Sequence, residues 1–556
     1  MEESPLPVAE RGPADTLLRV GKAYSMTDPG RIHRAVAIRD GRIIATSSSP
    51  DGLDSLQGTR TEVVDDPGLV VFPAFNDTHN HQLWASRDLD HVSLESARDI
   101  ADVVERLRLR AAVTPPGEWV VSSRCWHETH LKEERLPTAS ELDAASTEHP
   151  ICVQRGGHVM VVNSRALALA GFGRDVPDPE RGTVVRDANG VPTGLLIEPG
   201  AVEPVRRLLP QLAPERQVEL LARQCAEYNA RGIGVVRDPG LLVDEMEVYQ
   251  RLWEQGRLTT RSRVMFWIMP DASVEEKLAF IDSWAVRSGY GDDLLKIWGF
   301  KFMMDGGVEG AHLCEPYANN PAYHGHAFWE PGDFERLVDR AVSRGWKVGC
   351  HAVGDAAVER VLGTYERVLR RRPQTPPGSL VIEHAFLVNA DQRARAVRAG
   401  IGITVQHPLL FSLGGNLLRY WGEQRTREVM PVRAWLDEGA MVAAGSDCNV
   451  SFFDPLLSIW GLVTRGTRTA GVQGPEHVVS RYDALRLYTA AGAALLGESA
   501  NLGTIEQGRL ADLVAFRTDL IECPVDDLPE LAPAATLVGG LPVHDPEGLL
   551  GTVTRE

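Results

Sequence analysis

The segment from Phe72 to His81 reads FPAFNDTHNH, an apolar run that ends in two histidines separated by one asparagine. Side chains of an extended segment alternate between two sides, so the imidazoles of His79 and His81 are expected to point the same way. A pair placed like this can chelate one metal ion. The alternative is one hydrogen-bonded core histidine and one solvated histidine, and the rest of the chain must supply the deciding ligands.

Further candidate ligands follow other apolar runs. His351 begins HAVGD, His384 lies in IEHA, and Asp447 ends AAGSD. Each residue alone could be an ordinary polar residue of a core or rim. Several imidazoles together with one carboxylate suit zinc or a similar divalent ion. The sequence therefore predicts a metal site, provided that these segments meet in space.

The pattern of apolar runs predicts how they meet. Short apolar runs alternate with amphipathic stretches such as FERLVDRAVSRG, which is typical of a parallel α/β sheet. Eight strands are the number of a (β/α)8 TIM-like barrel, whose chemistry lies at the C-terminal strand ends. The predicted strands are 69–75, 234–238, 263–269, 295–304, 347–353, 380–385, 402–407 and 441–447.

The two chain ends have a different pattern, with short strands and turn signals such as the Asp-Gly pair of AVAIRDGRIIATS. They predict a small β-sandwich domain built from 1–72 plus 502–556, although two independent terminal hairpins are an alternative. The barrel would then occupy 73–501. Since the stretch between its first two strands is too long for one crossover, we expect an insertion subdomain at 90–230.

Composition excludes some classes of function. The chain has 556 residues, 43% of them hydrophobic, and a formal net charge of −18, which disfavours binding to nucleic acid or an anionic membrane. Seven scattered cysteines without a C-x-x-C pair argue against disulfides. No apolar run reaches the roughly 20 residues of a membrane span, and the N-terminus lacks a signal pattern. We expect a cytoplasmic protein.

Lys301, in GFKFMMDGG, differs in chemistry from the other candidate ligands. An ammonium group has three donors and no acceptor, so an unmodified lysine cannot bind a metal. It could be a counter-ion for Asp305, or a barrel residue that extends its amine towards solvent. Carboxylated by CO2, the side chain would instead be an anionic carbamate able to bridge two cations.

The chain resembles the amidohydrolase superfamily, and within it the amidohydrolase-3 branch of N-substituted formamide deformylases and YtcJ-like proteins. The resemblance covers nearly the whole chain. It rests on FPAFNDTHNH, LPTASELDAAS, GGHVMVVNSRALALAGF, GTVVRDANGVPTGLL, GFKFMMDGG, HAVGDAAVERVL, VIEHAFLV, VAAGSDCNV and LGTIEQGRLADLVAF. Two departures, Ala74 where the family has glycine and Gln82 where it has an apolar residue, leave every ligand in place but could alter the pocket floor.

The resemblance implies a site of one or two divalent ions, most simply zinc, in which Asp447 is both a ligand and the proton shuttle. The other ligands it implies are His79 and His81 on the more buried ion, a carboxylated Lys301 as a bridge in a binuclear site, and His351 and His384 on the second ion.

Substrate contacts are less clearly marked. His158, in GGHVMVVNS, matches a family position that resembles a pocket contact, and Trp84 follows the metal motif closely enough to form an apolar wall. A loop histidine and a core tryptophan are the alternatives. Asp355 and Glu383 could orient the ligand imidazoles His351 and His384, or they could be a helix cap and a buried structural acid.

The expected function is metal-dependent hydrolysis of the C–N bond of a small N-acyl, N-formyl or cyclic amide. The same metal site could serve deamination, decarboxylation or C–C cleavage, because a fold does not select its reaction. A non-catalytic, metal-stabilised binding protein would lack a ligand or the base, and this chain retains both. The expected partner is a small molecule, and the family leaves room for a homo-oligomer.

Overall fold

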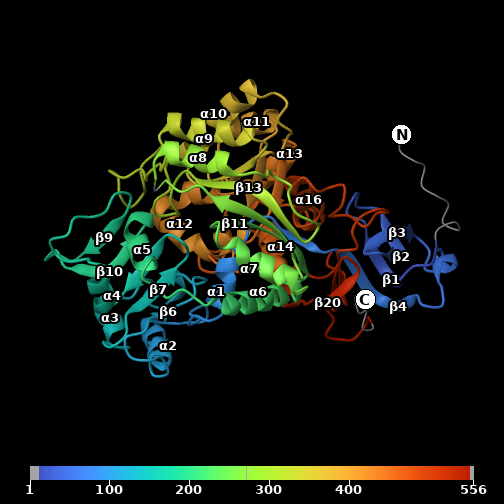
Figure 1. Ribbon diagram of the computed structural model, residues 1–556, viewed down its shortest axis with the longest axis horizontal. Coiled ribbons are helices and arrows are strands. Elements are labelled where there is room, and N and C mark those ends of the chain that lie inside the picture. The colour runs from blue at the N-terminus through green and yellow to red at the C-terminus, as the bar shows by residue number, and fades with distance from the viewer. Residues whose placement is uncertain (1–11, 271, 551–556) are drawn as a thin grey trace.

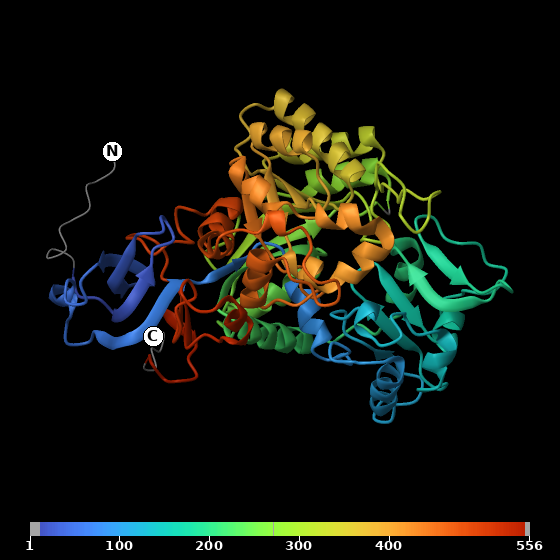
Figure 2. The ribbon, with the colours of Figure 1, turned by 180° about the vertical axis from the view of Figure 1, so that it is seen from behind.

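A computed structural model describes residues 12–270 and 272–550 of the chain. A central barrel lies between two smaller β-rich parts, as both ribbon views show (Figures 1 and 2). The insertion that follows the first barrel strand lies on one side. A sheet formed by both chain ends lies on the other. The fold is the expected TIM-like barrel with additional β structure.

The barrel is an eight-stranded parallel sheet in the order β17-β16-β15-β14-β13-β12-β11-β5. Its open edge is bridged next to β5, where Thr78 donates through its backbone nitrogen and its Oγ1 to the carbonyl of Ala444, at 3.2 and 2.7 Å. The strands are β5 (Phe75–Asp77), β11 (Ile233–Leu241), β12 (Arg261–Trp267), β13 (Leu295–Met303), β14 (Lys347–Ala352), β15 (Leu380–His384), β16 (Gly402–Val405) and β17 (Met441–Ala444).

The prediction that the first strand, 69–75, belongs entirely to the barrel was wrong. Residues up to Pro73 belong to the terminal sheet, and the chain changes sheets at Ala74, whose nitrogen donates to the carbonyl of Asp512 at 2.9 Å. Barrel strand β5 starts at Phe75. As a result, His79 and His81 lie in the turn after β5 rather than in an extended strand.

Helices cover the outside of the barrel. They present apolar faces with helical spacing, as in α9, where Phe334, Leu337, Val338 and Ala341 are buried. The helices are α6 (Pro214–Asn229), α7 (Met246–Glu254), α8 (Val274–Ser283), α9 (Pro331–Ser343), α10 (Asp355–Arg371), α11 (Ala390–Arg398), α12 (His407–Arg427), α13 (Val432–Asp437), α14 (Pro455–Thr464), α15 (Arg481–Leu487) and α16 (Ala490–Leu496).

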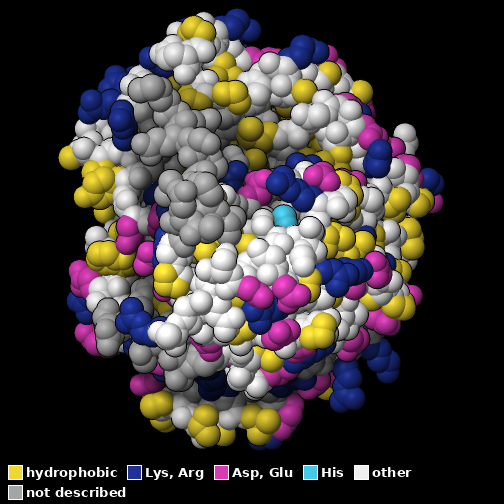
Figure 3. Space-filling model, turned by 90° about the vertical axis from the view of Figure 1, so that its right-hand side faces the viewer, with side chains coloured by type: hydrophobic (Ala, Val, Ile, Leu, Met, Phe, Trp, Pro, Cys, Tyr) yellow, Lys and Arg dark blue, Asp and Glu magenta, His cyan; other side chains and the backbone are white. Residues whose placement is uncertain are grey.

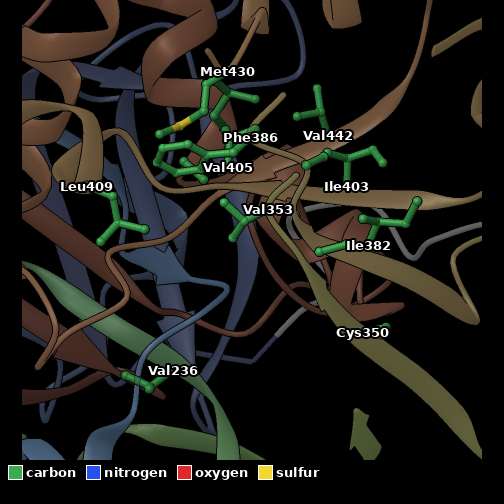
Figure 4. Close-up of a cluster of buried hydrophobic side chains, with 14 of the residues drawn as sticks. Val236, Cys350, Val353, Ile382, Phe386, Ile403, Val405, Leu409, Met430 and Val442 are labelled. Atoms are coloured by element: carbon green, nitrogen blue, oxygen red, sulfur yellow. The ribbon is translucent and has the colours of Figure 1, made fainter. Parts of the chain in front are cut away.

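One large apolar core joins these helices to the strands. Figure 4 shows part of it, with Phe386 and with Val236, Ile382, Ile403 and Val442 from four different barrel strands. All five side chains are buried. This packing fixes the strand positions, and therefore the positions of the polar side chains at their C-terminal ends.

Both chain ends contribute to one seven-stranded sheet in the order β20-β19-β18-β4-β1-β2-β3. Central strand β4 pairs with β1 and with β18, so the alternative of two independent hairpins was wrong. Edge strand β3 also contacts the segment before β18, where the backbone nitrogen of Ile43 donates to the carbonyl of Arg509 at 2.9 Å. Its strands are β1 (Thr16–Tyr24), β2 (Ile32–Arg39), β3 (Arg42–Ser47), β4 (Glu62–Pro73), β18 (Leu513–Phe516), β19 (Ala535–Val538) and β20 (Leu541–His544).

On the face of the molecule that carries this sheet, acidic and basic side chains are interspersed (Figure 3). No helix of the described residues is long and apolar enough to cross a membrane. All seven cysteines are free thiols.

The insertion has its own five-stranded sheet in the order β6-β7-β8-β10-β9, with separate apolar cores on either side. The exact boundaries 1–72, 73–501, 90–230 and 502–556 stay predictions. The strands of the insertion are β6 (Val120–Val121), β7 (Ile151–Arg155), β8 (Val159–Val162), β9 (Thr183–Arg186) and β10 (Pro192–Ile197). Its helices are α2 (Ile100–Ala111), α3 (Ala139–Asp143), α4 (Ser164–Leu169) and α5 (Pro199–Arg206), while α1 (Gln82–Asp88) precedes it.

A buried ion pair joins the barrel to the terminal sheet: Arg261 of β12 donates through Nε and Nη2 to the carboxylate of Asp512 at 2.6 and 2.8 Å. We expect Asp512→Asn to lower the free energy of unfolding by about 3 kcal/mol, because it leaves a buried guanidinium without its counter-charge. Asp437→Asn, which removes an exposed partner of Arg433, should cost less than about 1 kcal/mol. Urea unfolding of both variants would measure this, and equal midpoints would contradict it.

Candidate metal centre

All eight residues predicted for the site line one cavity at the C-terminal ends of the barrel strands. The cavity has a volume of about 1150 Å³ and is bounded by the barrel and by the insertion. The predicted residues that line it are His79, His81, Trp84, His158, Lys301, His351, His384 and Asp447.

The tightest group of potential ligands is formed by His79, His384 and Asp447. One ligand atom from each of these buried residues lies within 4.8 Å of the other two. Oδ1 of Asp447 is 3.3 Å from Nε2 of His79 and 3.2 Å from Nε2 of His81. The structure thus brings three of the four predicted imidazoles to the single predicted carboxylate.

The orientation of His79 is set by Glu383. Nδ1 of His79 lies 2.6 Å from Oε2 of Glu383, which also accepts from Arg237 at 2.6 Å. Burial opposes ionisation of Glu383, but Arg237 and His79 hold its pKa well below its usual range. The carboxylate is therefore an acceptor, Nδ1 carries the proton, and Nε2 presents a lone pair to the cavity.

The tautomer of His384 follows from a chain of hydrogen bonds to the same carboxylate. Thr404 Oγ1 donates to Glu383 at 2.8 Å and accepts from Nε2 of Gln406 at 2.8 Å. The amide oxygen of Gln406 therefore faces Nδ1 of His384, at 2.7 Å, and accepts its proton. Nε2 of His384 therefore carries no proton, and it offers a second lone pair on the side of the ring that faces away from Gln406.

These atoms fit a divalent cation. Nε2 of His79 and Oδ1 of Asp447 are both acceptors, yet they lie 3.3 Å apart, and Oδ1 is buried without a hydrogen-bond partner among the described residues. Burial lowers the pKa of His384 to about 3, which keeps this imidazole neutral. Neutral imidazoles facing a carboxylate are a donor set for zinc-like ions.

His351 lies at the edge of this group. Its ring centroid is 4.5 Å from that of His384, while its Nε2 is 3.1 Å from the carbonyl oxygen of Gly306. Burial lowers its pKa well below the ordinary value, so the ring is neutral. His351 is thus placed beside the central group rather than within it.

Lys301 is buried, with Nζ 5.9 Å from the ring centre of Trp267. The alternative that it is a counter-ion for Asp305 was wrong: the Asp305 carboxylate accepts from the backbone nitrogens of His312, Val353 and Gly354, and no ion pair with Lys301 occurs in the described part of the chain. Burial lowers the pKa of Lys301. A larger neutral fraction of this amine favours reaction with CO2.

The backbone at two candidate ligands is in the left-handed region. His384 has φ +75° and Asp447 has φ +58°, and Ala385 follows with φ +44°. Side chains other than glycine adopt this conformation at a cost of about 1 kcal/mol or more each. Such strain clusters at functional sites, where the surrounding fold holds the side chain in place.

His158 and Trp84 lie on the cavity wall, as predicted for substrate contacts. His158 comes from the turn between β7 and β8, and its Nδ1 is 2.9 Å from Oε2 of Glu198. Burial disfavours its charged form, but the carboxylate outweighs burial and raises its pKa. Trp84 stacks on the ring of His81, with centroids 4.8 Å apart. Their contact with substrate stays a prediction.

The sequence predicted the contacts of the two supporting acids, Glu383 and Asp355, only in part. Glu383 was expected beside its neighbour His384, but it contacts His79 instead. Asp355 is the first residue of α10 and accepts from the nitrogen of Cys314 at 2.9 Å, so its role is at the helix start.

Three supporting residues were missed altogether: Arg237, Thr404 and Gln406. A signal was present for two of them, because Thr404 and Gln406 are two positions apart around the end of β16 and thus share one side. No comparable feature of the sequence marks Arg237, which lies in strand β11, as a supporting residue.

Several known proteins resemble this chain over most of its length. The amidohydrolase family model matches residues 62–544. N-substituted formamide deformylase of Arthrobacter pascens is 28% identical over 91% of this chain and 94% of its own, and YtcJ of Bacillus subtilis strain 168 is 26% identical over 94% and 98%. An uncharacterized metal-dependent hydrolase from Pyrococcus horikoshii shares the fold, with a TM-score of 0.73 and 23% identity over 92% of this chain and 99% of its own.

The match spans the barrel, the insertion and most of the terminal sheet, and the buried acceptors of the cavity suit a divalent cation. The chain therefore belongs to the amidohydrolase family.

Proposed function

We propose that the protein hydrolyses the C–N bond of a small N-acyl, N-formyl or cyclic amide, with Asp447 moving the proton. The observation that carries the proposal is the position of Asp447 Oδ1, 3.3 and 3.2 Å from the imidazoles of His79 and His81 inside the cavity. The relative that is 28% identical is named for the deformylation of N-substituted formamides, which supports amide cleavage.

The residues that would hold the metal are His79, His81, His384 and Asp447, with His351 and a carboxylated Lys301 completing a second position. When bound, a divalent cation supplies Lewis acidity, which makes water a nucleophile near neutral pH and polarises a carbonyl oxygen. The mixture of imidazole and carboxylate donors favours zinc.

Asp447 performs two proton transfers in this proposal. Its carboxylate takes a proton from the attacking water, and the resulting carboxylic acid gives that proton to the leaving nitrogen. The second transfer matters because an amide anion is too basic to leave unaided. In sum, an amide and one water become a carboxylate and an amine that ends as an ammonium ion.

The same donors could instead serve deamination, decarboxylation or C–C cleavage. The test is metal content per chain of the full-length protein purified without added metal, followed by a screen of N-formyl and N-acyl amines. We expect one or two divalent ions and amine release that stops on chelation. A metallated protein inert towards every amide would favour the other reactions. A chain that stays free of metal even after incubation with zinc would contradict the site.

Asp447→Asn should retain the fold and most of the metal while turnover falls by roughly 100-fold or more, because an amide side chain cannot accept the proton. Asp454→Asn is the matched control: Asp454 caps α14 outside the cavity, and asparagine caps helices equally well. Steady-state kinetics and elemental analysis of both variants test the role. Comparable turnover in the two variants would remove Asp447 from catalysis.

Lys301→Ala should lose bound metal and regain part of it when a short carboxylic acid such as acetate is added, because the acid can replace the bridging carbamate. Lys347→Ala is the control, since Lys347 also lies over an indole, 5.1 Å from Trp298, but donates to the carbonyl of Leu496 and lines no part of the cavity. Elemental analysis measures both variants. Unchanged metal in Lys301→Ala would make this lysine structural.

A further inference from the structure

The cavity has a second charged feature apart from the metal centre, a row of arginines on the side of the insertion. We call five of them the arginine wall: Arg87, Arg110, Arg124, Arg206 and Arg207. Arg181 and Arg155, which pairs with Glu128 and Glu309, also line the cavity. Four of the five come from the insertion. Since the whole chain has a formal net charge of −18, overall composition does not explain this concentration of positive charge.

Two of these arginines share one carboxylate at the end of α5. Arg206 and Arg207 lie 3.1 and 3.3 Å from the two oxygens of Glu203. Burial lowers the pKa of Arg206, and the positive charge of Arg124 lowers it further although Glu203 opposes this. The pair therefore carries one positive charge more than its partner balances, and Arg124 adds its own field to the same space.

A third arginine has no carboxylate of its own. Arg110 donates to the backbone carbonyl of Asp90 at 2.7 Å, while the carboxylate of Asp90 pairs with Arg216. No other partner of Arg110 occurs in residues 12–270 and 272–550. Arg87 is neutralised by Glu245 at 2.6 Å. The five arginines thus pair with three carboxylates, which leaves two guanidinium charges without an ion-pair partner among the described residues.

Arg124 connects the wall to the metal centre. Its Nη1 donates to Asp88 at 2.7 Å, and no other hydrogen bond from its guanidinium occurs among the described residues, although the group has five N–H donors. Its side chain is 11% exposed. The guanidinium carbon lies 5.7 Å from the ring of Trp84, which stacks at 4.8 Å on His81. One indole therefore separates unused donors from a candidate metal ligand.

We propose that the arginine wall, through Arg124 and Arg206, binds a carboxylate of the substrate, so that the enzyme acts on acylated amines that also carry a carboxylate, such as N-formyl amino acids. The inference rests on the proposed function, because it names the substrate class of the same cavity. A guanidinium fork matches a carboxylate in shape and charge. Trp84 beside it fits an organic substrate better than a free inorganic anion.

The test compares N-formylleucine with its carboxamide, which is neutral but has the same formamide group. With the full-length metal-loaded enzyme, we expect kcat/KM to be at least tenfold higher for the carboxylate. Arg124→Gln should lower kcat/KM about tenfold or more for N-formylleucine and less than about twofold for the carboxamide, because only the carboxylate uses the charge-assisted hydrogen bonds. Arg257→Gln is the matched control, since Arg257 pairs with Glu219 at 2.7 Å outside the cavity.

A second variant is needed because Arg124→Gln removes an ion-pair partner of Asp88. A loss of activity in that variant alone would also follow from misfolding. Arg206→Gln leaves Glu203 paired with Arg207, and it should show the same selective loss. Equal rates for both substrates, unchanged by either variant, would overturn the inference while the proposed function stands. Inhibition by inorganic phosphate that depends on Arg124, combined with equal kcat/KM for the two substrates, would also overturn it, since the wall would then bind a free anion and not the substrate.

The carboxylate site can be tested independently of amide hydrolysis. If neither probe is hydrolysed, calorimetric titration of the enzyme with each probe still tests the wall. Tighter binding of N-formylleucine than of its carboxamide, lost in Arg124→Gln and kept in Arg257→Gln, would support the carboxylate site even though amide hydrolysis had failed. Equal binding of both probes would overturn it.

Discussion

The buried contact between Glu383 and Arg237 supports the rest of the metal centre. Arg237 donates through Nη2 to both oxygens of the carboxylate at 2.8 and 2.6 Å, and neither residue is exposed. An ionised Glu383 can then accept from His79 and from Thr404. Without the guanidinium, burial would favour the protonated acid, and the direction of each hydrogen bond that leads to the imidazoles would be lost.

The barrel explains why this arrangement is stable. Its strands come from distant parts of the chain, and the hydrogen bonds of the sheet fix their register, as between β14 and β15, where His351 lies opposite Glu383. The apolar core behind the strands leaves little freedom for their ends. Strained backbone at His384 and Asp447 is held by this framework.

The cavity combines two charged regions with different origins. The barrel supplies imidazoles and carboxylates that suit a cation, whereas the insertion supplies most of the arginines that suit an anion. Trp84 and the ring of His81 lie between them. A small molecule that spans this distance would place its amide at one end and a negative group at the other, so the barrel would determine the reaction and the insertion the choice of substrate.

The sequence by itself indicated the barrel, seven of its eight strand segments, and four histidines and Asp447 as candidate ligands, because strand periodicity and residue type are local properties. Lys301 became a candidate ligand only through the family resemblance. It also showed that both chain ends form strands. Only the tertiary structure decided that the chain changes sheets at Ala74, that Glu383 orients His79 rather than His384, and that Asp305 does not pair with Lys301. It alone revealed Arg237 and the arginine wall. These features depend on contacts between residues far apart in the chain, which no local pattern encodes.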